Sequence, residues 1–185
     1  MTTATTVLRT EHDAILRMLD VAEEVARRLQ GGERVPPETL TGLREFFRLF
    51  ADRCHHGKEE DLLFPLLEKK GLARAGGPIG VMLAEHEKGR ALVRQMAEAA
   101  EAYGHGAGTA GRRWADAAHG YAGLLREHID KENNVLFVMA EKLLTDTEQS
   151  KLAAAFESAE EEKMGAGTHQ RLHALMEKLA ADVLA

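Results

Sequence analysis

Two segments of the chain share one pattern of residues that can do metal chemistry. Residues 55–64 and residues 128–137 both follow His-x-x-Lys-Glu-x-x-(Leu/Val)-Leu-Phe. In each copy a His lies four residues before a Glu, as His55 and Glu59 in the first copy and as His128 and Glu132 in the second. Positions i and i+4 of an α-helix lie on one face, one turn apart. Each copy therefore points an imidazole and a carboxylate the same way, and two such faces turned toward each other would form a binuclear metal site.

Two further histidines fall on apolar stripes of helical period. His12 lies between Leu8 and Ile15, and His86 follows Met82 by one turn. A single inward His is usually a core residue that hydrogen-bonds a backbone carbonyl. Four inward imidazoles, one from each long helical segment, are hard to explain separately, because buried polar groups are costly unless they are satisfied.

The two glutamates strengthen the metal interpretation. Without a cation, Glu59 and Glu132 would be buried like charges lying close together. Imidazole nitrogen combined with carboxylate oxygen suits iron, manganese, zinc and copper, whereas a structural zinc site would have thiolates and a calcium or magnesium site would have mainly oxygen. Because carboxylates can bridge two metals, one Glu from each of two facing helices favours a metal pair over a purely structural polar core.

Glycine and proline clusters divide the chain into stretches of helical period. We expect helices over residues 5–30, 37–70, 78–103 and 111–144, and a C-terminal helical segment over 146–182 that is interrupted near Gly165. Pro65 is expected to bend the second helix or to end it early. Thr145 and Glu148 have the spacing of a capping box, which starts a new helix.

These elements predict an all-α fold with no strands. Four long helices joined by short turns favour an antiparallel up-down-up-down four-helix bundle with an additional C-terminal helical segment. At this length we expect a single domain over residues 1–185, with the bundle at about 5–144 and the C-terminal segment at 145–185.

The composition excludes several kinds of protein. The formal net charge is −6 and no basic stripe is present, so nucleic-acid binding is not expected. No apolar stretch approaches the length of a membrane span, and no signal-peptide pattern begins the sequence. The single cysteine, Cys54, excludes an internal disulfide, which fits a reducing compartment. We therefore expect a soluble cytoplasmic protein that does not bind membranes.

The order of these motifs resembles the hemerythrin-like, or HHE cation-binding, domain over about residues 8–144. The resemblance implies a four-helix bundle that holds two non-heme iron ions bridged by carboxylates. It further implies that the bridges are Glu59 and Glu132 and that the terminal ligands are His12, His55, His86 and His128.

The chain departs from the oxygen-carrying members of that family in two places. Carriers have a second His one turn after the helix 3 His, where this chain has Arg90. They also have an Asp five residues after the helix 4 His, where this chain has Asn133, with Glu132 one place earlier. The chain therefore resembles the bacterial and sensor-type members more closely. His56 follows the first motif His directly and is a further candidate ligand; the alternative is a solvated or hydrogen-bonded His on the helix flank.

Three of the four principal histidines follow a glutamate, at Glu11, Glu85 and Glu127. A carboxylate that accepts the second ring N–H of a ligand would fix its tautomer. Neighbouring positions are about 100° apart around a helix, so we interpret these glutamates as charged flanks instead. The simplest expectation is that Glu60 is a solvated charge, that Tyr121 is a packed residue with a satisfied hydroxyl, and that His169 is a surface residue. Contact of these three with the metals is left open.

The resemblance implies that the protein binds or senses dioxygen or a related small oxidant, such as nitric oxide or peroxide. A sensor without an output domain would need a protein signalling partner. Alternatives are a di-iron oxidoreductase that acts on peroxide or nitric oxide, and an iron buffer. Because no dedicated acid–base apparatus is evident, binding or sensing is favoured over an enzyme.

Overall fold

The computed structural model describes residues 2–184, and every regular element in that range is helical. Met1 and Ala185, the outermost residues of the expected domain, lie outside the described residues. In chain order, with η for π-helical segments, the elements are α1 (Ala4–Gln30), α2 (Pro37–Phe46), η1 (Phe47–His56), η2 (Glu59–Leu63), α3 (Phe64–Lys69), α4 (Pro78–Gly104), α5 (Ala110–Lys131), η3 (Glu132–Leu136), α6 (Phe137–Leu143), α7 (Asp146–Met164) and α8 (Thr168–Leu184).

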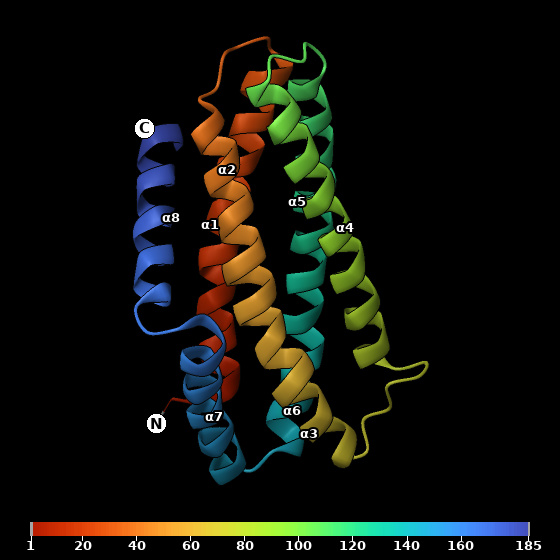
Figure 1. Cartoon of the computed structure of the whole chain (residues 1–185). Helices are drawn as coiled ribbons and strands as arrows, with labels where there is room; N and C mark the ends of the chain where they lie inside the picture. Colours follow the sequence, from red (N-terminus) through yellow and green to blue (C-terminus); the bar gives the residue numbers. More distant parts are fainter. Residues whose placement is uncertain (1, 185) are drawn as a thin grey trace.

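These elements confirm the predicted antiparallel four-helix bundle. Residues 37–69 form one continuous helix from α2 through α3, and residues 110–143 form another from α5 through α6. Together with α1 and α4 they run alternately up and down, as Figure 1 shows. Within residues 2–184, no helix combines the length and apolar character needed to cross a bilayer.

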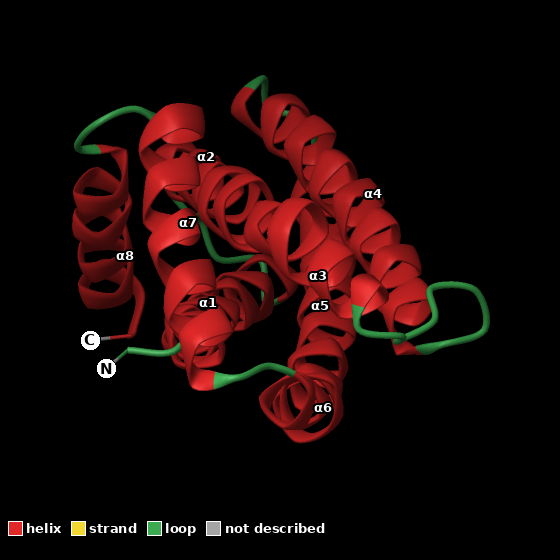
Figure 2. Ribbon diagram, turned by 90° about the horizontal axis from the view of Figure 1, so that it is seen from below, coloured by secondary structure: helices red, strands yellow, loops and turns green. Residues whose placement is uncertain are grey.

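The C-terminal segment is two helices that pack along one side of the bundle. α7 contacts α1 and η2, and α8 contacts α1 and α2, so both lie on the side away from α4 (Figure 2). The break predicted near Gly165 is confirmed: Gly165 and Gly167 both have a φ of 81°, a conformation that glycine adopts at little cost. The capping box is also confirmed, because Thr145 and Glu148 satisfy each other's backbone N–H groups.

Pro65 does not end its helix, which continues to Lys69. The N–H of Phe64 donates to the carbonyl of Glu59, five residues back, so a π-helical turn ends immediately before the proline. The α-helical register then restarts at Phe64. Pro65 therefore lies in the first turn of the new register, where its missing N–H breaks no α-helical hydrogen bond.

The second motif copy contains the same π-helical turn, in which the N–H of Phe137 donates to the carbonyl of Glu132. In both copies the turn begins at the motif glutamate. Such turns are rare and are often found at functional sites. The backbone alone therefore indicates that Glu59 and Glu132 belong to a functional site.

A polar layer separates two hydrophobic clusters in the bundle. One cluster is centred on residues such as Phe46, Phe47 and Trp114, and the other on Phe64 and Phe137. The predicted site residues lie between these clusters along every bundle helix. Helix packing on both sides therefore holds the polar layer in the dry middle of the bundle.

Replacing Thr145, the N-cap residue of α7, should destabilise the folded chain. We expect Thr145→Ala to lower the free energy of unfolding by about 1 kcal/mol, because it removes the acceptor for the Glu148 N–H. Urea denaturation measures the change. The control is Ser158→Ala on the same helix, whose hydroxyl bonds only the Ala154 carbonyl within that helix. An equal loss in both variants would contradict the capping role.

Candidate metal centre

The structure brings all seven predicted site residues into the polar layer. Every one of these residues is nearly or fully buried, with at most 3% of its total surface exposed. Their nitrogen and oxygen atoms fall into two groups that share Glu59, and the atoms of each group lie within 4.8 Å of one another. The first group is His12, His55, Glu59 and Glu132, and the second is His56, Glu59, His86 and His128.

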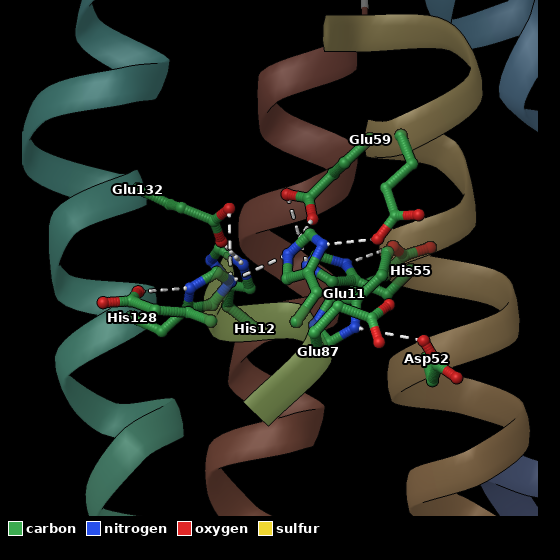
Figure 3. Close-up of polar contacts among 12 residues, drawn as sticks. Glu11, His12, Asp52, His55, Glu59, Glu87, His128 and Glu132 are labelled. Carbon is green, nitrogen blue, oxygen red and sulfur yellow. Dashed lines mark hydrogen bonds and ion pairs between the residues drawn. The ribbon is translucent and has the colours of Figure 1, made fainter. Parts of the chain in front are cut away.

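Each motif glutamate extends between histidines of both groups. The oxygens of Glu59 lie 3.6 Å from His55 Nε2 and 3.5 Å from His86 Nε2. The oxygens of Glu132 lie 3.1 Å from His12 Nε2 and 3.3 Å from His128 Nε2. Figure 3 shows the two carboxylates approaching the imidazoles from different helices. One oxygen of each carboxylate therefore faces each half of the site, which is the arrangement a bridging ligand needs.

The inward-facing atoms suit a bound cation. Both oxygens of Glu59 and of Glu132 are buried without a hydrogen bond, as are the Nε2 atoms of His12 and His55. The Nε2 atoms of His86 and His128 face each other at 3.1 Å. Buried polar atoms are rarely left without partners. The donor set, imidazole nitrogen and carboxylate oxygen, matches transition metals such as iron, manganese, zinc and copper.

The outward-facing nitrogens of the two motif histidines are each held by a glutamate from a neighbouring helix. His55 Nδ1 lies 2.8 Å from Glu11, and His128 Nδ1 lies 2.9 Å from Glu85. A carboxylate accepts hydrogen bonds, so the proton is on Nδ1 and the Nε2 lone pair points into the site.

The motif lysines hold these outer glutamates in place. The Lys58 ammonium donates to Glu11, and the Lys131 ammonium donates to Glu85. The spacing shared by the two copies therefore supplies a His, the Lys that fixes the carboxylate partner of that His, and a Glu. Sequence reasoning missed this role, although the lysine repeated in both copies was a visible signal.

The residue that follows each motif glutamate accepts a hydrogen bond from one of the two principal histidines outside the motifs, His12 and His86. Glu60 accepts from His86 Nδ1 at 2.6 Å, and Asn133 accepts from His12 Nδ1 at 2.9 Å. All four principal histidines therefore present Nε2 to the centre. Arg90, at the position where carriers have a second His, donates to Glu60 instead.

Three expectations about neighbouring residues need correction. Glu11 and Glu85 are not charged flanks, because each reaches across to the His of another helix rather than to the His that follows it. Glu60 is not a solvated charge but a half-buried partner of His86. Glu127 is exposed, as expected for a flank. Tyr121 is buried as expected, but the expected partner of its hydroxyl is missing, because no hydrogen bond reaches that hydroxyl among residues 2–184.

The protonation of the centre follows from its two carboxylates. Burial and the neighbouring Glu132 raise the pKa of Glu59 to about 8. Burial opposes ionisation of Glu132 as well, but His128 and His12 outweigh it and lower the pKa of Glu132 to about 2. In the absence of a cation, one of the two carboxyl groups therefore keeps a proton near neutral pH, as expected for like charges held close together.

His56 belongs to the half of the site that contains His86. Its ring stacks on that of His86, with centroids 3.9 Å apart. Neither ring nitrogen of His56 has a hydrogen bond, and Asp52 lies 3.5 Å from its Nδ1. A role as a ligand stays a prediction, but a position on the solvated flank is wrong.

A third group of potential ligands lies outside this centre, where the C-terminal helices meet the bundle. It consists of Cys54, Glu160 and His169. Lys58 also reaches it, because its ammonium lies 2.6 Å from Glu160. His169 is half-buried against Glu160, so it is neither a free surface residue nor a member of the main centre.

The comparisons with known proteins agree with this geometry. Residues 3–140 match the family described as hemerythrin HHE cation binding domain. Two uncharacterized proteins of Mycobacterium tuberculosis and one of Mycobacterium bovis are each 27% identical over 163 residues, which is 88% of this chain and 63% of each relative. The chain thus spans less than two thirds of the length of these curated relatives. No solved structure shows a significant match. The family match covers most of the chain, which therefore belongs to the hemerythrin HHE cation-binding family and is a metal-binding helical bundle.

Proposed function

We propose that this chain is a non-heme di-iron protein that binds or senses dioxygen or a related small oxidant, such as nitric oxide or peroxide. The observation that best supports the proposal is the placement of Glu59 and Glu132, each of which faces histidines of both halves through separate oxygens. Two carboxylates so placed suit a pair of metal ions rather than one.

The chain's own residues would hold and shield the metal pair. Glu59 and Glu132 would be the bridges, and His12, His55, His86 and His128 would be the terminal ligands. Iron bound there would supply one-electron redox chemistry and affinity for small diatomic molecules. The outer hydrogen bonds fix each imidazole before the metal arrives, which lowers the cost of ordering the site.

The phenylalanine that ends each motif copy would limit the access of water. The ring of Phe137 stacks on His12 at 5.4 Å, and the ring of Phe64 stacks on His86 at 6.0 Å. An apolar shell controls the dielectric and solvent access around a metal, and hence its redox potential.

Binding or sensing is favoured over turnover of peroxide or nitric oxide. The two carboxylates and the four principal imidazoles all have a place around the proposed metals, and His56 is itself a candidate ligand, so no inner group is set apart as a dedicated proton donor. A sensor would act on a protein partner, and the contact of Lys58 with Glu160 on α7 offers a physical link from the site to the C-terminal helices. The single cysteine supports a reducing, cytoplasmic setting for such a protein.

Neutralising both proposed bridges should abolish binding of the metal pair. We expect the wild-type chain to bind two iron ions and a Glu59→Gln, Glu132→Gln variant to bind none, because the amides remove the charges that balance the cations. Metal analysis after anaerobic loading measures the ratio of iron to protein. Glu127→Gln is the matched control, since Glu127 is exposed next to His128. Full iron content in the double variant, or one zinc ion in place of iron in the wild type, would refute the proposal.

The role of His56 can be separated from that of the other ligands. If His56 is a ligand, we expect His56→Ala to weaken iron binding in the half of the site that contains His86 by at least about 10- to 100-fold, which is the range for losing a residue that only orients a ligand. Competition with a chelator measures the affinity. His119→Ala, at an exposed position on α5, should have no effect. Equal affinities in the two variants would exclude His56 as a ligand.

Metal removal should leave a protein whose stability falls as the pH rises from about 6.5 to about 8. Burial and Glu132 raise the pKa of Glu59 to about 8, and Glu59 and Glu60 raise that of His86 to about 9 although burial opposes them. In the unfolded chain these groups have ordinary pKa values of 4.5 and 6.5. The folded state therefore binds more protons in this window, and stability is lost as they dissociate.

Thermal denaturation of the metal-free protein at the two ends of this window tests the prediction. The histidines whose pKa is lowered, His55, His56 and His128, act in the opposite direction only below about 6.5. The iron-loaded protein should not show the loss, because the cations stabilise the ionised carboxylates. A metal-free protein that becomes more stable toward higher pH would contradict this account.

A further inference from the structure

A pocket of about 300 Å³ leads from the surface to the metal centre between η1 and α4. Its wall includes Gly89, Val93 and Ala97 from α4 and the ring of Tyr121 from α5. Tyr121 and Gly89 are buried, whereas Val93 and Ala97 are half-buried. The pocket therefore passes from solvent into the dry interior of the bundle.

The inner end of this pocket is His56. This side chain is only 4% exposed, and neither of its ring nitrogens has a hydrogen bond. His56 also stacks on His86 and groups with Glu59. A molecule that reaches the end of the pocket would thus meet an unsatisfied imidazole of the candidate centre itself.

The outer end of the pocket is strongly basic. Arg44, Arg48 and Arg94 line it, and within residues 2–184 none of these three has an ion pair with a carboxylate. The acidic residue of the pocket, Asp52, is already paired with Arg90. Three guanidinium groups without a carboxylate partner therefore gather at one opening of a chain whose formal net charge is −6. Charges of one sign around the opening of a low-dielectric cleft raise the local concentration of the opposite ion and its rate of association.

We propose that this pocket is an entrance that attracts small monovalent inorganic anions and leads them to the His56 side of the metal centre. The delivery of anions to a metal ion rests on the proposed di-iron function. The binding of anions in the pocket does not depend on it. The three arginines select for negative charge at the surface, and the narrow apolar wall admits only small ions. The pocket would therefore give anions faster access than neutral ligands of similar size.

Azide is a suitable probe, because its binding to oxidised iron changes the absorption of the metal. In the iron-loaded full chain, an Arg44→Gln, Arg48→Gln, Arg94→Gln variant should bind azide about tenfold more slowly at low salt, and its rate should lose most of its salt dependence. The matched control is Arg34→Gln, Arg112→Gln, Arg113→Gln, which removes the same charge at exposed positions away from the pocket. This control should bind azide at close to the wild-type rate.

Two further measurements separate steering from structural damage. Nitric oxide is neutral, so its association rate should be unchanged in the pocket variant. Val93→Phe should slow azide binding by filling the pocket while leaving iron content unchanged. The proposal would be overturned if azide associated equally slowly with both arginine variants, or if the pocket variant slowed nitric oxide as much as azide. A wild-type rate of azide association with Val93→Phe would also overturn it.

The proposal can fail independently of the di-iron function. Line broadening of the chloride NMR signal by the metal-free full chain reports anion binding without iron. We expect the pocket variant to lose most of this broadening and the control variant to keep it. Equal broadening by the pocket variant and the control variant would exclude the anion site, even if the wild-type chain bound two irons. If the two variants differ as expected but the wild-type chain binds no iron, only the di-iron function is refuted.

Discussion

Two carboxylates buried close together impose the main constraint on this molecule. Glu59 and Glu132 have no exposed surface, and they lie in a layer between two hydrophobic clusters. Burying an ionised carboxylate costs several kcal/mol unless it is paired. The pair must therefore either keep a proton or receive a cation, and the histidines around it are arranged so that a cation can take the proton's place.

The same set of contacts, a His bonded to a Glu that is bonded to a Lys, surrounds the carboxylates twice and gives this shell of residues approximate two-fold symmetry. In one half His55 is held by Glu11 and Lys58, and in the other His128 is held by Glu85 and Lys131. The symmetry ends outside this shell. Lys58 continues to Glu160 on α7, whereas the side of the site that contains His56 opens toward the arginine-lined pocket. One half of the centre is thus connected to the C-terminal helices and the other to solvent, which would give the two metal positions different surroundings.

The sequence predicted the bundle and the inward side chains because both depend on helical period alone. His12 and His86 could be placed on inward stripes without knowing the angle at which the helices pack. The partners of their second ring nitrogens could not be predicted in this way, since Glu60 and Asn133 act across helices and the result depends on the rotation of one helix against another. For the same reason the sequence predicts a flank position for Glu11, whereas Glu11 contacts His55 of another helix. The continuation of the helix through Pro65 depends on a π-helical turn, which the 3.6-residue period of the sequence does not reveal.

Anomalous diffraction from crystals of the iron-loaded protein at the iron absorption edge would test the central claim most directly. The account predicts two strong peaks between Glu59 and Glu132, one beside His12 and His55 and the other beside His86 and His128. A single peak in this layer, or a peak found instead at Cys54 and Glu160, would contradict it.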